Sequence, residues 1–332
     1  MPPLRLLFFG TPDVAVPTLE RLIAGPHDVV GVVSQPDRAR GRGRKHSPSP
    51  VSNVAIREDI PLVRPERVGD EAALESMRDM RPDLGIVVAF GQFLPKKVRE
   101  LPSCGYLINA HASLLPKYRG ASPIASAILD GQSSTGVSVM RVEKEMDSGA
   151  VALVRETPIG ERENTLQLTT RLAALAADAI EEAVDQIARG EIAWTEQDAA
   201  LVTIAPKLEK SDAELDLREP ASALANRVHA LAPKPGARVS LAPPGDDEPT
   251  ALKILEADVA AFDAAAPSPG TIVLVPETAS LRIATGEGWL VPRVLQRAGG
   301  KPMPIDAFLR GFEIGDGMRC AVPTSDTKGD AS

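Results

Sequence analysis

The segment from residue 109 to residue 123 carries side chains whose types and spacing suit acyl-group chemistry. Asn109 and His111 are two positions apart and follow an apolar run that predicts a buried strand. Side chains at this spacing on a strand project from the same face. An amide there can donate a hydrogen bond to a developing oxyanion, and an imidazole can move protons near neutral pH. The pair suits formyl or acyl transfer to an amine, although a lone Asn-x-His is also typical of a strand end with a polar cap.

A carboxylate, Asp147, lies in the turn from Glu145 to Gly149, between two apolar runs over residues 136–142 and 150–156. In an open α/β sheet, functional residues from separate loops gather at the ends of strands. We therefore expect Asp147 to reach His111, to favour the charged form of its imidazole and to fix its orientation.

The elements that must position these groups predict an α/β fold. Residues 4–9 and 28–34 are apolar runs separated by a glycine turn and a helical pattern, for which Thr11 is the expected N-cap. This βαβ unit implies a parallel sheet with right-handed crossovers. Residues 84–90 are apolar on both faces, as in a central strand. We expect a doubly wound, mostly parallel, Rossmann-like sheet, without the Gly-x-Gly-x-x-Gly pattern of a dinucleotide site.

Length and composition predict a soluble protein of more than one domain. The chain has 332 residues, of which 43% are hydrophobic and 25% charged. No apolar run approaches membrane-spanning length, and two cysteines make neither a disulfide framework nor a zinc site by themselves. A net charge of -8 argues against indiscriminate nucleic-acid binding. We expect a cytoplasmic protein without a metal ion.

The chain is expected to divide into a catalytic domain over residues 1–190, a linker over 191–203 and a smaller domain over 204–322. The linker is assigned because this stretch is polar and aperiodic and follows the strongest helical pattern, residues 165–189. Beyond it, short strand-like pieces between glycine and proline turns predict a small β-barrel. Residues 323–332 are expected to form a disordered tail.

A basic loop over residues 35–50 stands out in this acidic chain. Its acidic residue is Asp37, and its glycines and prolines give no periodicity, so we expect a mobile loop. Its cations are Arg38, Arg40, Arg42, Arg44 and Lys45. Beside a strand end such a loop can clamp phosphates, although a short basic run alone is typical of solvated surface.

Several motifs resemble the signature of the folate-dependent formyltransferases. They are Asn109-x-His111, Ser113-Leu-Leu-Pro116, Arg119-Gly-Ala-x-Pro123 and the turn around Asp147, in which Glu145 replaces a glycine of the family pattern. Within that group the chain is most similar to the methionyl-tRNA formyltransferases, over almost its whole length. The basic loop is similar to the one that enters the tRNA acceptor stem in these enzymes, with Arg42 at its core. The stretches 281–290 and 296–301 are similar to their OB-like C-terminal domain.

The resemblance implies transfer of a formyl group from 10-formyltetrahydrofolate to the α-amino group of methionyl-initiator-tRNA. The catalytic residues would be Asn109, His111 and Asp147. The tetrahydrofolate would be held through backbone contacts and apolar packing by Ser113, Leu114, Leu115 and Pro116, with Phe90 and Gly91 against its pterin. The cations of the basic loop would bind the tRNA. We expect initiator methionyl-tRNA and folate as partners, no metal, no membrane association, and a monomer.

Three other interpretations stay open. The acceptor could be a small amine, such as glycinamide ribonucleotide or an amino sugar nucleotide, although neither requires the basic loop or the barrel. Water could be the acceptor, as in a formyltetrahydrofolate hydrolase, but the multidomain form of that class needs a dehydrogenase for which this chain is too short. A non-catalytic RNA-binding module would require none of Asn109, His111 and Asp147.

Overall fold

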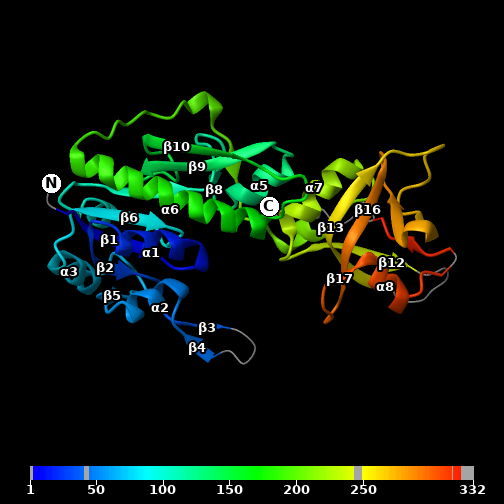
Figure 1. Ribbon diagram of the computed structural model, residues 1–332, viewed down its shortest axis with the longest axis horizontal. Helices are drawn as coiled ribbons and strands as arrows, with labels where there is room; N and C mark the ends of the chain where they lie inside the picture. Colours follow the sequence, from blue (N-terminus) through cyan, green and yellow to red (C-terminus); the bar gives the residue numbers. More distant parts are fainter. Residues whose placement is uncertain (1–2, 41–44, 243–248, 316, 323–332) are drawn as a thin grey trace, which may run out of the picture. The chain divides into compact units, whose positions relative to one another are not determined.

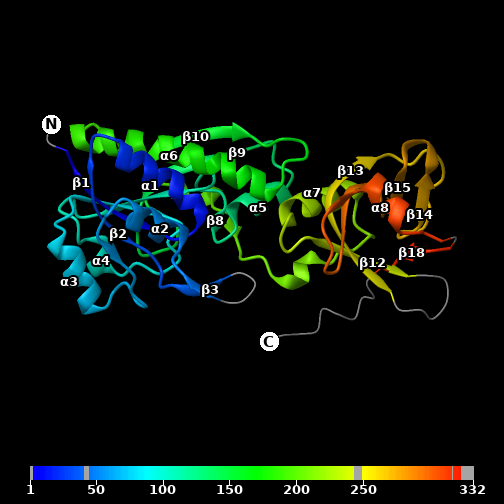
Figure 2. The ribbon, with the colours of Figure 1, turned by 60° about the horizontal axis from the view of Figure 1, so that its bottom comes forward.

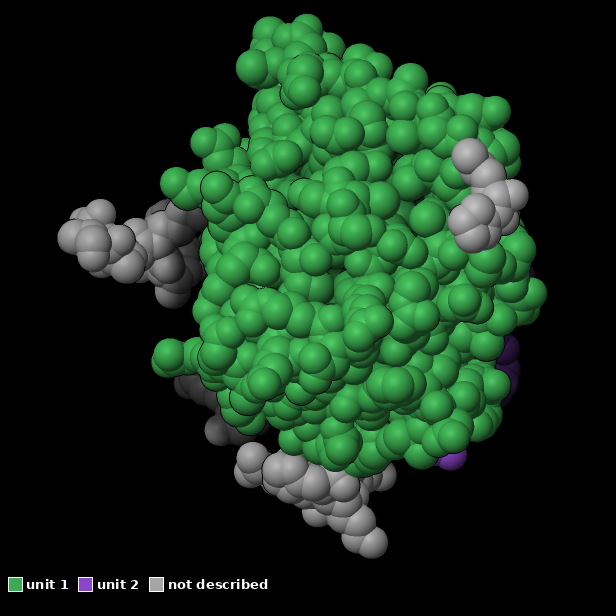
Figure 3. Space-filling view, turned by 90° about the vertical axis from the view of Figure 1, so that its left-hand side faces the viewer, with its two compact units in different colours: residues 1–123, 134–158, 169–206 green, residues 124–133, 159–168, 207–332 purple. Residues whose placement is uncertain are grey.

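The computed structural model describes residues 3–40, 45–242, 249–315 and 317–322. The chain forms two compact units (Figure 1). The first comprises residues up to 123 together with 134–158 and 169–206, and Figure 3 shows it as one continuous surface. The second comprises residues 124–133, 159–168 and 207 onwards. Residues 191–203, the predicted linker, group with the first unit.

The first unit is built on a sheet with the strand order β10-β9-β7-β6-β1-β2-β5. Neighbours run parallel from β5 to β7, whereas β9 is antiparallel to both β7 and β10. Strand β6 lies in the middle, as its two-sided apolar pattern predicts. The strands are β1 (Arg5–Gly10), β2 (Asp28–Val33), β5 (Leu62–Val63), β6 (Leu84–Val88), β7 (Leu107–His111), β9 (Ser134–Arg141) and β10 (Val151–Pro158).

Helices cover both faces of this sheet (Figures 1 and 2). Alternate side chains of β1 point to opposite faces, so Leu6 and Phe8 enter one core and Leu7 and Phe9 the other, all fully buried. The first core is closed by α1 (Val16–Ala24), α2 (Pro50–Arg57) and α6 (Thr165–Arg189), and the second by α3 (Glu71–Asp79) and α4 (Lys96–Arg99). This three-layer arrangement is the predicted doubly wound fold.

The turn after β1 differs from the prediction. Thr11 does not cap a helix, because a 3-10 turn over Asp13–Ala15 precedes α1 and has Pro12 at its N-cap. The Thr11 hydroxyl instead donates to the carbonyl oxygen of Phe90 at 2.9 Å and accepts from the backbone N–H of Gln35 at 3.3 Å. Thr11 therefore joins the carboxyl ends of β1, β2 and β6, where the strand order reverses direction and α/β sheets form crevices.

The second unit contains an antiparallel sheet that is nearly closed into a barrel. Its strand order is β14-β15-β16-β13-β12-β18, with β17 beside β16, and a bridge between Thr271 and Arg319 brings the two outer strands together. The strands are β12 (Ala237–Ala242), β13 (Thr250–Ala260), β14 (Ile272–Val275), β15 (Ser280–Ala284), β16 (Trp289–Arg297), β17 (Met303–Pro304) and β18 (Arg319–Cys320). The predicted small barrel is confirmed.

Helices complete the core of the second unit. Leu224 and Val228 of α7 (Ala221–Leu231) pack in one cluster with Ile254 and Leu290 of the barrel. The other helical elements here are most of α5 (Pro123–Leu129), α8 (Ile305–Gly311), and the 3-10 turns η3 (Lys210–Ala213) and η4 (Pro276–Thr278). Among the described residues, no helix combines the length and the apolar character needed to cross a membrane.

Candidate active site

Asn109 and His111 lie at the carboxyl end of β7, between β6 and β9. Asn109 is in register with Val87 on one side and Met140 on the other, and the two-residue spacing puts it on the same strand face as His111. The Asn109 side chain is partly exposed. Within the described part of the chain no side chain or backbone group hydrogen-bonds to its amide, which leaves its N–H groups available to a ligand.

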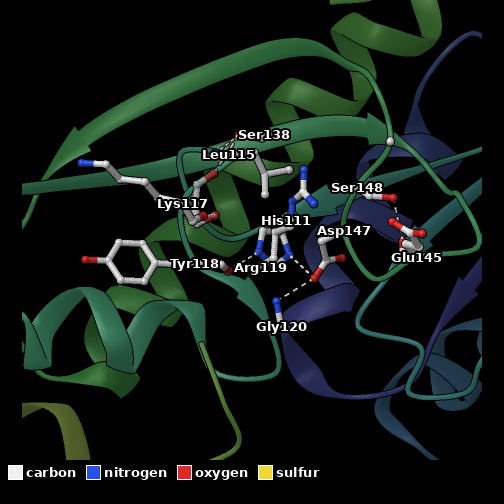
Figure 4. A network of polar contacts seen from close by, with 12 residues as sticks. His111, Leu115, Lys117, Tyr118, Arg119, Gly120, Ser138, Glu145, Asp147 and Ser148 are labelled. Atoms are coloured by element: carbon white, nitrogen blue, oxygen red, sulfur yellow. Dashed lines mark hydrogen bonds and ion pairs between the residues drawn. The ribbon is translucent and has the colours of Figure 1, made fainter. Parts of the chain in front are cut away.

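The imidazole of His111 is almost buried and is held at both ring nitrogens (Figure 4). Nε2 lies 2.8 Å from the carbonyl oxygen of Tyr118, and Nδ1 lies 3.5 Å from Oδ2 of Asp147. A carbonyl oxygen can only accept, so Nε2 carries the hydrogen. In a neutral ring Nδ1 would then bring a lone pair toward the carboxylate, so the doubly protonated ring suits both contacts.

Asp147 lies in the turn between β9 and β10, as the sequence predicts, and faces His111. Its carboxylate also accepts a hydrogen bond from the backbone N–H of Gly120 at 2.9 Å. Asp147 has a φ of 52°, a left-handed backbone conformation that residues other than glycine adopt infrequently. The structure thus brings together His111, at the end of β7, and Asp147, in the turn between β9 and β10, and Asn109 lies on the same strand face as His111. The catalytic roles of the three residues stay a prediction.

The loop after His111 is shaped by internal hydrogen bonds. Ser113 is fully buried, and its hydroxyl donates to the carbonyl oxygen of Lys117 at 2.6 Å. Ser138 of β9 accepts from the N–H of Leu115 at 3.0 Å and donates to the carbonyl oxygen of Ser113 at 2.8 Å. The Ser113 hydroxyl is therefore engaged within the loop, whereas Leu114, Leu115 and Pro116 are half-buried. Sequence reasoning missed Ser138, whose signal is a hydroxyl within an apolar strand.

Phe90 and Gly91 lie at the crevice, but the Phe90 side chain turns into the core. It is 2% exposed and packs edge-on against Phe9, with 5.6 Å between ring centroids. Gly91 has a φ of 85°, and a Cβ there would lie 2.5 Å from Nε2 of Gln35. The Phe90 carbonyl already accepts hydrogen bonds from Thr11 and Gln35. The exposed Gly91 is therefore the position that can offer backbone atoms to a ligand.

The basic loop is partly ordered as a ribbon, contrary to the expectation of a loop without regular structure. β3 (Arg38–Arg40) pairs antiparallel with β4 (Lys45–Ser47), because backbone hydrogen bonding can impose a strand on a sequence without a periodic pattern. Arg42 and Arg44 lie outside the described residues, and Arg38 is exposed.

A partner for the acidic residue of this loop also emerges. Nη1 of Arg64 lies 2.7 Å from the carboxylate of Asp37. The negative charge of Asp37 is therefore paired with an arginine outside the loop rather than with the loop's own cations. This pairing gives no local sequence signal.

The predicted linker contacts the site. Trp194 packs edge-on against Tyr106, with 5.7 Å between ring centroids, and the guanidinium of Arg141 lies over both rings. Further along, β11 (Ile204–Ala205) pairs parallel with β8 (Arg119–Gly120), and the hydroxyl of Thr203 accepts from the N–H of Tyr118 at 2.8 Å. Residues 203–205 therefore support the loop that carries Tyr118, whose carbonyl oxygen contacts Nε2 of His111.

No group of three or more His, Cys, Asp or Glu side chains is arranged to hold a metal ion within the described ranges. The polar groups of the site belong to one amide, one imidazole and one carboxylate. They suit proton transfer and stabilisation of a developing oxyanion.

Comparison with known proteins shows the family to which this chain belongs. A family model described as formyl transferase matches residues 4–184, and one described as formyl transferase, C-terminal domain, matches residues 207–313. The chain belongs to the formyl transferase family. It is 40% identical over 314 residues to the methionyl-tRNA formyltransferase of Citrifermentans bemidjiense, covering 95% of each chain. It is 42% identical to that of Bordetella bronchiseptica, covering 93% of this chain and 100% of the relative.

Solved structures share the fold of this formyl transferase at low sequence identity. The N-formyltransferase from Helicobacter canadensis, in complex with folinic acid and dTDP-3-aminofucose, has a TM-score of 0.63 at 16% identity, over 87% of this chain and 98% of that one. HypX from Aquifex aeolicus, in complex with tetrahydrofolic acid, has a TM-score of 0.57 at 16% identity, over 95% of this chain and 50% of that one.

Proposed function

We propose that this formyl transferase moves a formyl group from 10-formyltetrahydrofolate to the α-amino group of methionyl-initiator-tRNA. The observation that carries the proposal is similarity at 40% identity, over 95% of both chains, to a relative named for that activity. This similarity extends through the C-terminal domain, which a family model matches over residues 207–313. A folate donor is supported by the folate compounds bound to two proteins of the same fold.

Asn109 would stabilise the charge that develops on the formyl oxygen. Its amide is partly exposed at the strand end, and a donor placed there gains strength as the oxygen becomes negative. Loss of such a donor costs on the order of 3 kcal/mol of transition-state stabilisation.

His111 and Asp147 would handle the proton. As the amine nitrogen forms its bond to the formyl carbon, the bond from that carbon to the folate nitrogen breaks, and the amine's proton must reach the folate nitrogen. The carboxylate of Asp147 can accept a proton from the amine and pass it to the folate nitrogen, while the doubly protonated ring of His111, whose Nδ1 lies 3.5 Å away, holds the carboxylate in position. The hydrogen bond from Gly120 keeps this carboxylate in place.

The remaining site residues would bind the substrates. Leu114, Leu115 and Pro116 would contact the folate by apolar packing and backbone atoms, and the backbone of residues 90–91 would lie against its pterin. Arg38 and the other cations of the basic loop would contact tRNA phosphates. The proposal includes a monomer that acts in the cytoplasm, where initiator tRNA is used, and needs no metal ion.

The test is formyl transfer from 10-formyltetrahydrofolate to four acceptors: methionyl-initiator-tRNA, elongator methionyl-tRNA, free methionine and an amino sugar nucleotide. We expect transfer to the initiator tRNA well above the other three. Transfer to the sugar nucleotide alone would show that the acceptor is a small amine and not the initiator tRNA. Folate binding without transfer to any tRNA would overturn the proposal.

A further inference from the structure

Gln197 lies in the 194–205 segment and joins the two loops on either side of the Asp147 carboxylate. Its Nε2 lies 2.8 Å from the carbonyl oxygen of Asp147 and 2.7 Å from that of Gly149. Its Oε1 accepts from Nε and Nη2 of Arg119 at 3.0 and 2.8 Å. We propose that Gln197 is a positioning residue that holds Asp147 in its catalytic conformation, an inference that rests on the proposed function.

The orientation of the Gln197 amide follows from its neighbours. Arg119 can only donate hydrogen bonds, and the two carbonyl oxygens can only accept them. The amide therefore has one possible assignment, in which both N–H groups and both oxygen lone pairs are used. A side chain whose donors and acceptors all make hydrogen bonds is held in one orientation, and it holds its partners in turn.

The turn needs such support because Asp147 has a left-handed backbone. A φ of 52° is unfavourable at a residue other than glycine and persists where the surroundings hold it. Gln197 binds the carbonyl of Asp147 itself and that of Gly149, so it fixes the peptide units after the strained residue. Through Arg119 it also fixes the strand whose Gly120 N–H binds the carboxylate. The Gln197 amide thus supports both the backbone of the Asp147 turn and the strand that hydrogen-bonds to the Asp147 carboxylate.

Gln197 is itself held by the backbone around it. Two residues earlier, Thr195 exchanges a pair of backbone hydrogen bonds with Val151 at the start of β10, at 2.8 and 2.9 Å. The following Asp198 caps the 3-10 turn η2 (Ala199–Leu201) through a 2.9 Å bond to Ala200. Gln197 and the turn around Asp147 therefore belong to one continuous network of hydrogen bonds.

The experiment is a double-mutant cycle with Asp147 in the full-length chain. Gln197→Met keeps the side-chain length and removes all four bonds, whereas Gln197→Glu keeps the acceptor for Arg119 and removes the donors. We expect each to lower kcat for formyl transfer to methionyl-initiator-tRNA by about 10- to 100-fold, because small displacements of a catalytic group have effects of this size. KM for either substrate should change by less than about threefold, because the hydrogen bonds to Arg119, Asp147 and Gly149 leave no group of the Gln197 amide free for a substrate.

In the Asp147→Ala background the same Gln197 changes should lower kcat by less than about twofold, because no carboxylate remains to be positioned. Equal losses in both backgrounds would overturn the proposal, and so would an unchanged kcat. Gln296→Met is the matched control, because Gln296 bonds a single carbonyl, that of Gly300, within the second unit. It should keep wild-type kcat.

A second readout needs no substrate. Amide hydrogen exchange at residues 143–149 should quicken in Gln197→Met while exchange in β6 stays as in the wild type. Unchanged exchange at 143–149 would overturn the positioning role even if the chain proved inactive on tRNA. Failure of the proposed function is recognised separately, by a wild-type chain that transfers no formyl group. If Gln197→Met does not fold, Gln197→Glu enters the same comparisons.

Discussion

At the scale of single residues, the His111 ring lies between the carbonyl oxygen of Tyr118 and the carboxylate of Asp147. The proposed mechanism assigns the amine's proton to this carboxylate, so the first variant removes its negative charge. Asp147→Asn preserves the shape and can still accept from the N–H of Gly120, but it cannot take a proton from the amine. We expect kcat/KM for formyl transfer to fall by about 100-fold or more, within the range for general acid–base groups, with folate affinity unchanged. Steady-state kinetics and folate titration measure both.

Glu71→Gln provides the control for this change, because Glu71 pairs with Arg78 on the exposed surface of α3. It should keep the wild-type rate. An Asp147→Asn variant with full activity would remove the carboxylate from the mechanism and leave proton transfer to solvent.

Residues within the site differ in how much of their role the sequence can predict. The contact between His111 and Asp147 could be predicted, because both residues follow apolar strand patterns whose ends gather in an α/β sheet, whereas their catalytic roles stay a prediction. Gln197 lies in a polar, aperiodic stretch, and its importance depends on Arg119 and the Asp147 turn, which are distant in the chain. Contacts of this kind leave no period and no motif, so they need coordinates.

At the scale of elements, the turn between β9 and β10 depends on a glycine for its tight approach to β9. A Cβ at Gly149 would lie 2.0 Å from the carbonyl oxygen of Arg141, which is backbone and cannot move aside easily. Gly149→Ala should therefore destabilise the first unit by about 1–3 kcal/mol and lower kcat by displacing Asp147. Urea unfolding and the formyl-transfer assay measure the two effects.

Gly25→Ala is the matched control in the same unit. A Cβ there would meet its nearest neighbour, the carbonyl oxygen of Arg21, at 3.4 Å, and the backbone φ is an ordinary -82°. It should leave stability and rate nearly unchanged. Equal effects of the two alanines would contradict a specific requirement at the turn.

Elements with a strong period were predicted well, and those fixed by distant partners were not. Helix α6 has the predicted ends, Thr165 and Arg189, because its apolar spacing and its final glycine are local signals. The β3–β4 ribbon and the β8–β11 pair were missed because backbone pairing, rather than a side-chain pattern, holds them. The prediction of Thr11 as an N-cap was wrong because the carbonyl of Phe90, which follows β6, accepts a hydrogen bond from its hydroxyl.

At the scale of the whole molecule, the two units have separate hydrophobic cores and can be followed separately. The chain has two tryptophans, Trp194 in the first unit and Trp289 in the second. Trp289 is 8% exposed and packs edge-on against Phe262, so its fluorescence should report loss of the barrel. A Trp194→Phe background isolates this signal and gives access to a buried histidine of the same unit.

His229 of α7 should make the second unit less stable in acid. Burial lowers the pKa of His229, although Glu256 and Asp258 nearby oppose the shift and Arg162 adds to it. The unfolded chain, with a histidine pKa of about 6.5, then binds more protons than the folded one, so the free energy of unfolding decreases as pH falls below that value. His229→Gln keeps an acceptor for the N–H of Ala257 and cannot titrate. Urea unfolding followed by Trp289 at about pH 7.5 and about pH 5.5 should therefore show a larger loss of stability in the parent than in His229→Gln, and equal losses would contradict the role of His229.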